Sequence, residues 1–385
     1  MFENLKATFR NLIQWRPSYG GTFYPQTPGS TFNYLQDAGI LWQNSAVGAC
    51  LNWITNAFNE ADIVCEYRRR DGTYEQMNHD VISLLKAPNR YYTEDHLWSG
   101  LLLSYLTAGR AYSYIEYTRG NTPGALYYLP HFQVRTIAEN GDFITRYEYT
   151  DQTVRSLKPT EVIHLKNRLD PYNYREGISP LAPVLREIVA DNEASAAAAA
   201  LMKNLGAPGI SFTPNQEITS QQKDILREYI GQRMRGDRRG ELIVFPVEGD
   251  VNTWGFSPEQ MAFDKIRNVP EERICALFGL SPIVVGLGAG LNRSTYSNYQ
   301  EAREAAYEAC MVPLWNTIAD QLSGQLLPQY GLDPAKVRLR FDCSKIRGLD
   351  QSEREQHEKV REDFIAGIIS KEEARGVLGY GDSDN

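Results

Sequence analysis

The spacing of apolar residues predicts where the first part of the chain forms helices. Leu51, Ile54 and Phe58 recur at intervals of three or four residues, which is the repeat of one helix face. They predict a helix over residues 45–60. The same criterion predicts a second long, apolar helix over 93–107.

The apolar period falls to two between residues 111 and 166. Short runs such as Tyr112–Tyr117 and Leu126–Leu129 are separated there by turn residues such as Asn140-Gly141. Alternation of this kind predicts strands, and the short spacing between the runs predicts an antiparallel sheet. Together with a further strand at 63–67, these residues predict an α+β domain in the first half of the chain.

Residues 180–205 predict a long helix because they are dense in alanine, the strongest helix former. The small alanine side chain also lets neighbouring helices approach closely. Gly206 and Pro208 are expected to end this helix. A small β-α-β unit is expected next, with strands at 210–212 and 242–247 and a helix at 221–234.

A further helix is expected from Ser257. The string Ser257-Pro258-Glu259-Gln260 combines an N-cap serine, a proline at the first helical position and a glutamine that closes a capping box. Pro270 lacks a backbone donor and is expected to kink or interrupt that helix. A Gly/Ser/Asn-rich loop at 281–297 then precedes a helix of about 45 Å from Asn298 to Leu327, which Pro313 is expected to bend.

The two ends of the chain differ in character. Residues 17–44 are rich in Gly, Pro, Tyr, Thr and Asn, and predict an extended arm or a disordered tail after a short amphipathic helix. At the other end, a strand at 337–341 precedes two charged helices. The last of these is expected to begin with a capping box from Ser370 to Glu373.

The composition, with 42% hydrophobic and 23% charged residues, is that of a folded globular protein, and 385 residues suggest two or three domains. No segment resembles a signal peptide or approaches the ~20 apolar residues of a membrane span. The formal net charge of −8 argues against a surface that clamps DNA, because phosphate-binding proteins carry a basic surplus. This charge fits a protein past which DNA slides, and it fits many cytoplasmic enzymes equally well.

The chain contains no recognisable constellation of residues for catalysis, metal binding or cofactor binding. The five cysteines form no Cys-x-x-Cys, and the five histidines have no metal-ligand spacing. Neither a nucleotide-binding Gly-x-x-x-x-Gly-Lys-Ser/Thr string nor a Gly-x-Ser-x-Gly nucleophile string is present. We therefore predict reduced thiols, no catalytic residues, no metal and no cofactor.

Two groups of residues are candidates for contact with a partner. Five arginines on and after the helix of the β-α-β unit form either a solvated helix face or a patch for an acidic partner or nucleic acid: Arg227, Arg233, Arg235, Arg238 and Arg239. In the loop before the long helix, Arg293 is the only charged residue between Ser281 and Asn298. Repeated around a symmetry axis, it would become a ring of positive charge.

Six short strings follow one another in a specific order. They are Leu84-Leu85-Lys86-Ala87-Pro88-Asn89, Gly177-Ile178-Ser179-Pro180-Leu181, Ala276-Leu277-Phe278-Gly279-Leu280-Ser281-Pro282, Thr295-Tyr296-Ser297-Asn298, Ile346-Arg347-Gly348-Leu349-Asp350 and Gly367-Ile368-Ile369-Ser370. Each string is weak by itself. Their joint order over residues 44–380 resembles the portal proteins of tailed bacteriophages, specifically the HK97-type family.

The resemblance implies an α+β portal fold whose parts follow the chain. The expected parts are an N-terminal helix and extended arm (1–44), an α+β wing (45–179), a first stem helix (180–207), a β-α-β clip (208–256), a second stem helix (257–280), a tunnel loop (281–297), a long kinked channel helix (298–328), a strand returning to the wing (329–349) and short crown helices (350–385).

The resemblance also implies a function. Twelve copies would form a ring at one capsid vertex, through which double-stranded DNA is packaged by the terminase large subunit and later ejected. The expected partners are other copies of the chain, DNA, terminase, the major capsid protein or scaffold, and a head-tail adaptor, with no membrane. The protein would act in the virion, and in the host cytoplasm during assembly, and would not be an enzyme. An unrelated oligomeric adaptor and a metal-dependent hydrolase remain as alternatives.

The resemblance finally gives roles to the candidate residues. Tunnel-loop residues would face the DNA channel: Asn292, Arg293, Ser294 and Thr295. The five arginines of the β-α-β unit would belong to the clip and dock the terminase motor or a connector protein.

Overall fold

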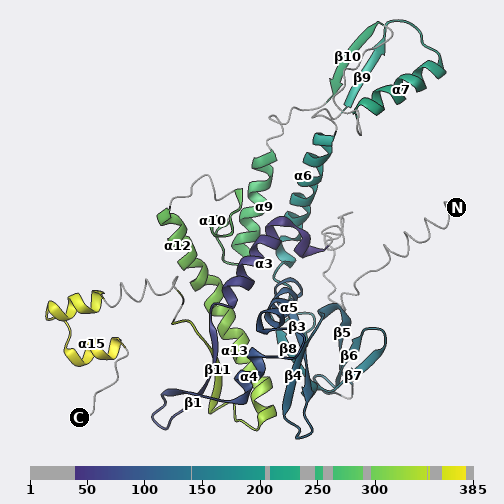
Figure 1. Ribbon diagram of the computed structural model, residues 1–385. Coiled ribbons are helices and arrows are strands. Elements are labelled where there is room, and N and C mark those ends of the chain that lie inside the picture. Colours follow the sequence, from purple (N-terminus) through teal and green to yellow (C-terminus); the bar gives the residue numbers. More distant parts are fainter. Residues whose placement is uncertain are drawn as a thin grey trace.

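The computed structural model describes residues 40–139, 141–203, 209–234, 248–254, 263–288, 296–344, 346 and 358–378. The expected N-terminal helix, and nearly all of the arm that follows it, lie outside the described residues. In Figure 1 the lower part of the molecule is a body of helices and small sheets, and two helices, α6 and α9, rise from it side by side.

Helix α3 (Ser45–Phe58) confirms the first helix that the apolar spacing predicts. It begins where the side chain of Asn44 accepts hydrogen bonds from the backbone N–H groups of Ala46 and Val47, which would otherwise lack partners. Its apolar face is buried in the main core of the body. Phe58, at its end, packs on Trp98 of α5 (Glu94–Ala108), with ring centroids 5.1 Å apart.

Strand β1 (Asp62–Arg68) lies in the middle of a three-stranded sheet with the order β11-β1-β2. Its partner β11 (Val337–Asp342) comes from the far end of the sequence and pairs antiparallel, with Cys65 opposite Leu339. The other partner, β2 (Tyr74–Met77), is largely exposed and has no clear apolar alternation, so the pattern did not predict it. Helix α4 (Asp80–Lys86) follows it.

The strands expected between residues 111 and 166 are confirmed, but they divide into two sheets of three. One sheet has the order β4-β3-β8, with β3 (Arg110–Tyr117), β4 (Pro123–Leu129) and β8 (Val162–Lys166). The other has the order β5-β6-β7, with β5 (Val134–Ile137), β6 (Arg146–Thr150) and β7 (Val154–Leu157). All neighbouring pairs are antiparallel. Strand β7 is mostly exposed and was not predicted.

Two glycines allow a close backbone approach between α5 and the segment that follows β8. Gly109 ends α5 in a left-handed conformation with φ 75°. A Cβ added to Gly177 would lie 1.9 Å from the carbonyl oxygen of Gly109, so no larger residue fits there. This contact explains physically why the string that begins at Gly177 starts with glycine.

Helices α6 (Leu185–Lys203) and α9 (Phe263–Leu277) pack against each other over much of their length and run in opposite directions (Figure 1). The buried positions of α6 recur every three or four residues, at Leu185, Ile188 and Asp191, so one face of this helix is covered. The possible interruption at Pro270 is not observed, because α9 continues through that residue. Pro270 is itself buried, and packing of α9 against α6 and α3 holds the helix together on both sides of it.

The small unit beyond the ends of α6 and α9 contains β9 (Gly209–Pro214), α7 (Ser220–Met234) and β10 (Gly249–Trp254) (Figure 1). The expected first strand and helix are confirmed. Strand β10, which pairs antiparallel with β9, was missed by the sequence prediction, and the strand expected at 242–247 lies outside the described residues.

The segment after α9 begins with a helical turn, where the sequence predicted a loop. Helix α10 (Pro282–Val285) is a single turn that ends at Gly286, which is left-handed, and Val284 is buried. The long helix follows as α12 (Tyr296–Ala306), a π-helical turn (Tyr307–Met311) and α13 (Val312–Leu326). The wider π turn lies directly before Pro313, where the regular hydrogen-bond pattern must change in any case.

Short 3-10 helices and a C-terminal helical segment complete the fold. The 3-10 helices are Leu41–Gln43, His131–Gln133, Pro159–Glu161, Ala182–Val184 and Leu327–Tyr330. Residues 358–365 are helical and precede α15 (Lys371–Val377). The predicted capping box is confirmed, since the N–H of Ser370 donates to Glu373 and the N–H of Glu373 donates to the Ser370 hydroxyl.

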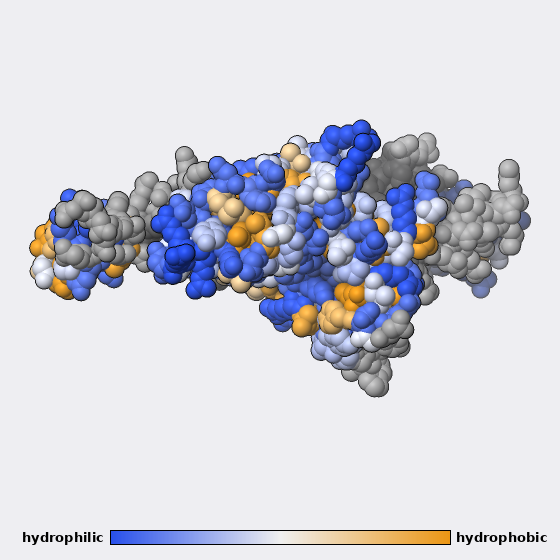
Figure 2. All heavy atoms as spheres, turned by 90° about the horizontal axis from the view of Figure 1, so that it is seen from below, coloured by the Kyte–Doolittle hydropathy of each residue, from blue (hydrophilic) through white to orange (hydrophobic). Residues whose placement is uncertain are grey.

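The surface seen from below is mainly hydrophilic, with small apolar patches separated by polar residues (Figure 2). Apolar atoms also gather on the segment at the left of that view, where α15 lies; its exposed apolar residues are Phe364, Ile365, Ile368 and Val377. None of the helices in the described part of the chain is long and apolar enough to span a membrane.

Candidate functional site

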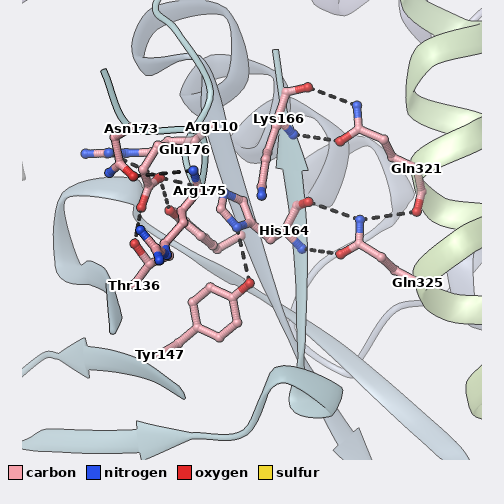
Figure 3. Close-up of polar contacts among 11 residues, drawn as sticks. Arg110, Thr136, Tyr147, His164, Lys166, Asn173, Arg175, Glu176, Gln321 and Gln325 are labelled. Atoms are coloured by element: carbon pink, nitrogen blue, oxygen red, sulfur yellow. Dashed lines mark hydrogen bonds and ion pairs between the residues drawn. The ribbon is translucent and has the colours of Figure 1, made fainter. Parts of the chain in front are cut away.

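The largest group of interacting buried polar side chains surrounds Glu176, in the segment between β8 and α6 (Figure 3). Its carboxylate lies 3.2 Å from Nη1 of Arg110 and accepts a hydrogen bond of 2.8 Å from the Tyr112 hydroxyl. It also accepts a hydrogen bond from Thr136 of β5. Glu176 therefore joins the first strand of one sheet to the first strand of the other.

His164 of β8 lies on the other side of this carboxylate. Its Nδ1 is 3.2 Å from the Tyr147 hydroxyl, and its Nε2 is 3.7 Å from Oε2 of Glu176. Burial lowers the pKa of His164 well below its usual 6.5, and the nearby cations Lys166 and Arg110 add to this effect. The ring is therefore neutral near pH 7, so its contact with Glu176 is not an ion pair. Burial and the Glu176 charge likewise raise the pKa of Tyr112 far above its usual range.

The geometry of this group does not fit an active site. Arg110, Tyr112, His164 and Glu176 are each at most 5% exposed, so a substrate has no access to them. The acid is already bound to a guanidinium and two hydroxyls, and the histidine cannot take up a proton near neutral pH. We conclude that the Glu176 group holds the two sheets together.

The helix α13 is attached to the edge of β8 by two glutamine side chains. Gln325 accepts from the backbone N–H of His164 at 2.8 Å and donates to its carbonyl at 3.0 Å. Gln321 makes the same pair of bonds to Lys166, at 2.7 and 2.9 Å. Gln329, one further turn along, accepts from the Tyr117 hydroxyl at 2.9 Å. Gln321 and Gln325 complete a strand edge that would otherwise lack partners for its backbone polar groups.

Asp191 of α6 anchors α6 and α9 where they leave the body. Its side chain is buried, with 1% of its surface exposed. One carboxylate oxygen accepts from the side-chain amide of Asn44 at 2.8 Å, and the other accepts from Nε of Arg267 on α9 at 2.9 Å. Arg273, further along α9, pairs with Glu187 of α6 at 2.6 Å. These contacts tie α6 and α9 to each other and to the N-terminus of α3.

A cavity of about 610 Å³ lies between β1, β2 and α4. Three of its polar lining side chains are already engaged: Lys86 pairs with Asp62 at 3.3 Å, and Nδ1 of His79 accepts from the N–H of Val81 at the start of α4. No group of three metal-ligating side chains occurs among the described residues. Within that part of the chain, the cavity therefore gives no support to a metal-dependent hydrolase.

The predicted partner-binding residues are only partly within the described chain. Arg227 lies exposed on α7, and Arg233 lies in the last turn of the same helix. The remaining residues lie outside the described chain: Arg235, Arg238, Arg239, Asn292, Arg293, Ser294 and Thr295. The structure thus places the start of the arginine group on the unit at the far end of α6 and α9.

The sequence interpretation missed the Glu176 group and the glutamine contacts. The glutamines left a signal, because Gln321, Gln325 and Gln329 recur every four residues on a helix that is otherwise apolar on that side. Glu176 left none, since its partners come from three other segments of the chain.

Comparison with known proteins gives consistent matches. A family model described as phage portal protein matches residues 45–379. An uncharacterized protein of Rickettsia bellii is 26% identical over 315 residues, which cover 78% of each chain.

Two solved structures share the fold. A chain in the neck of an empty GTA particle, computed with C6 symmetry, has a TM-score of 0.68 and 21% identity, with 90% of this chain and 94% of that chain covered. An HK97 family phage portal protein from Corynebacterium diphtheriae has a TM-score of 0.55 and 17% identity, with 80% and 95% covered. The α+β class predicted from the sequence agrees with these matches.

Proposed function

The chain belongs to the phage portal protein family, which is structural and not enzymatic, and we propose that twelve copies of it form the ring through which DNA enters and leaves a phage or phage-like particle. The predicted family and the predicted lack of enzymatic activity are confirmed by this membership. The number of copies in the ring, the DNA channel and the binding partners are what we propose.

The observation that carries the proposal is the pair α6 and α9, which pack along each other and bear the β9-α7-β10 unit at their far end. Two antiparallel helices cannot enclose a channel by themselves, but a ring of such pairs can form its wall. The Asp191 contacts fix this pair to the body, so each copy would present its wall segment in a defined orientation.

We assign the parts of the fold accordingly. The body formed by residues 45–179 corresponds to the wing, α6 and α9 to the two stem helices, and the unit from 208 to 256 to the clip. The π turn and α13 belong to the long kinked helix, and residues 358–378 to a short crown. The segment 281–297 corresponds to the tunnel loop, and α10 lies at its start.

The candidate residues then have distinct roles. Asn292, Arg293, Ser294 and Thr295 would face the DNA, and the single positive charge of Arg293 would be repeated around the channel. The arginines from Arg227 to Arg239 would dock the terminase large subunit during packaging, and afterwards the head-tail adaptor. Capsid protein or scaffold would hold the ring at one vertex of the particle.

The proposal is tested by the mass and symmetry of the purified protein. Light scattering and class-averaged electron microscopy are expected to show a ring of about a dozen subunits with a central hole. Portal subunits can depend on scaffold for assembly, so the measurement is made with and without scaffold protein. A chain that stays monomeric or dimeric at high concentration in both cases would overturn the proposal.

A further inference from the structure

The segment between β8 and α6 carries a cluster of exposed apolar and cationic side chains. Phe143, which lies beside this segment in space, belongs to the same cluster. We call it the loop surface and define it as Phe143, Arg168, Leu169, Tyr172, Tyr174 and Arg175. Its apolar members are strongly exposed, with Tyr172 at 66% and Leu169 at 62%. Large apolar groups clustered in solvent are typical of a binding surface.

The loop surface is held in one conformation by its backbone. The N–H of Asp170 donates to the carbonyl of Glu176 at 3.1 Å, and the Asp170 carboxylate accepts from the N–H of Tyr172 at 2.8 Å. Arg168 has a left-handed backbone with φ 55°, which residues other than glycine seldom adopt. The exposed side chains are therefore presented by a rigid loop, so little conformational entropy is lost when a partner binds.

Cationic side chains lie against the aromatic rings of the loop surface. Arg175 donates from Nε to the carbonyl of Phe143 at 2.7 Å, and its Cζ lies 4.6 Å from the centroid of the Tyr174 ring. Lys166 places Nζ 5.0 Å from the centroid of the Phe143 ring. Tyrosine and arginine are both enriched at the centres of protein interfaces. The positive charge means that the complementary surface is acidic.

The outward face of α12 carries such a surface. Glu301 and Glu304 of α12 and Glu308 of the π turn recur at intervals of three and four residues, so they lie on one side of the long helix, with the small residue Ala305 between them. Ala306 and Tyr307 on the opposite side are buried against the body. Among the described residues, none of the ion pairs engages these three glutamates.

The two surfaces lie on different sides of the molecule. The loop surface adjoins the β5-β6-β7 sheet, because Glu176 bonds Thr136 of β5 and Arg175 bonds Phe143 just before β6. That sheet lies at the right of the body in Figure 1, and α12 lies at the left. The two surfaces therefore cannot meet within one copy. A contact between unlike surfaces on opposite sides joins copies head to tail, which closes a ring when the rotation is correct.

We propose that the loop surface of one copy docks on the face that Glu301, Glu304 and Glu308 form on α12 and the π turn of the next copy, and so forms a contact that closes the ring. This inference rests on the proposed function, since it requires that the chain forms a ring. It specifies which surfaces meet.

The test is a charge exchange in the full-length chain under conditions where the unaltered protein forms rings. One variant carries Arg168→Glu and Arg175→Glu, and the other carries Glu301→Lys and Glu308→Lys. Each alone is expected to raise the protein concentration that gives half-maximal ring formation about tenfold or more, because like charges then face each other. The combination of all four changes in one chain is expected to restore rings.

Mixing the two separate variants identifies the arrangement. In a head-to-tail contact each variant repels a second copy of itself, whereas both kinds of contact between unlike variants join opposite charges. A mixture should therefore form rings in which the two variants alternate, at concentrations where neither variant forms rings alone. Arg119→Glu and Asp151→Lys, single charge reversals at exposed sites away from both surfaces, are the controls and should assemble like the unaltered chain.

Arg175 also bonds the backbone of Phe143, so its replacement could disturb the fold. Tyr172→Ala removes an exposed ring without any side-chain hydrogen bond among the described residues, and it should weaken assembly while leaving the urea unfolding midpoint unchanged. If the unaltered chain forms rings and all of these variants do so equally well, the docking inference is wrong and the ring proposal stands. If the unaltered chain forms no ring even with scaffold, both fail.

Discussion

The side-chain amide of Gln325 takes the place of a neighbouring strand beside His164. Its Oε1 accepts from the backbone N–H of His164, and its Nε2 donates to the backbone carbonyl of the same residue. Gln321 repeats this arrangement two residues along β8. The long helix is therefore joined to β8 by backbone-like hydrogen bonds, and a displacement of α13 would be transmitted directly to that strand.

Replacing Gln325 by leucine should destabilise the protein. Leucine has a similar size and a similar helix propensity, but it leaves the N–H and carbonyl of His164 without partners at a buried edge. Leaving both groups unsatisfied costs about 2–4 kcal/mol in total. Urea unfolding measures this loss, with Gln300→Leu on the exposed side of α12 as the control, for which a change within about 0.5 kcal/mol is expected. Equal effects of both substitutions would show that the strand-edge bonds add nothing.

Glu176→Gln should have a larger effect than its small change in shape suggests. The substitution removes the charge that pairs with the buried guanidinium of Arg110, and an unpaired buried charge costs about 3–5 kcal/mol. The control is Glu148→Gln, which breaks a half-exposed pair with Arg146 and should cost less than about 1 kcal/mol. Thermal and urea unfolding of the two variants provide the comparison, and similar losses would contradict the structural role given to Glu176.

The stability of the protein should fall as the pH is lowered from 6.5 toward 4. Burial lowers the pKa of His131 to about 4, with Arg110 adding to the effect, whereas an unfolded histidine titrates near 6.5. Between these values the unfolded chain binds a proton that the folded chain does not, so acid favours unfolding. For His131 this amounts to about 2 kcal/mol between pH 7.5 and 5.0, and His164 changes stability in the same direction.

The contribution of His131 can be separated from the others. His131→Asn keeps a polar atom near Ser104, to which Nδ1 lies 3.0 Å away, and removes the titrating ring. Its urea midpoint should depend less on pH over this range than that of the unaltered chain. A pH profile that is unchanged in His131→Asn would show that other groups govern acid stability.

Arg293→Ala should impair packaging or retention of DNA without preventing ring assembly. The residue is proposed to face the channel, where its loss removes one positive charge per subunit close to the passing phosphates. The yield of DNA-filled particles measures the effect, and electron microscopy of the rings measures assembly. Asn292→Ala, which changes a neighbour without changing the charge, is the control. A normal yield of full particles from Arg293→Ala would remove the proposed role of this arginine.

Reversing the clip charges should weaken docking of terminase. Arg235→Glu, Arg238→Glu and Arg239→Glu together replace three positive charges by negative ones on a unit that projects from the stem, while the ring itself should stay intact. A pull-down of terminase by the purified ring compares this variant with one carrying lysine at the same three positions. If the glutamate ring captures terminase as well as the lysine ring does, the clip assignment loses its support.

The sequence alone determined the elements whose signal is local. The periodic face from Leu51 to Phe58 gave a helix, and the capping box from Ser370 to Glu373 gave a helix start, because both depend on residues within a few positions of each other. The ordered strings around Gly177, Gly279 and Gly367 also identified the family correctly, since a family motif is itself a sequence pattern.

The tertiary structure decided what depends on distant partners. The pattern could not predict that β1 pairs with β11, that β10 pairs with β9, or that α9 continues through Pro270, because these outcomes depend on packing between remote segments. Glu176 is another case, since an isolated glutamate in a loop has no sequence feature that indicates burial. Its role arises only where folding brings Arg110, Tyr112 and Thr136 around it, and removal from water makes these contacts strong.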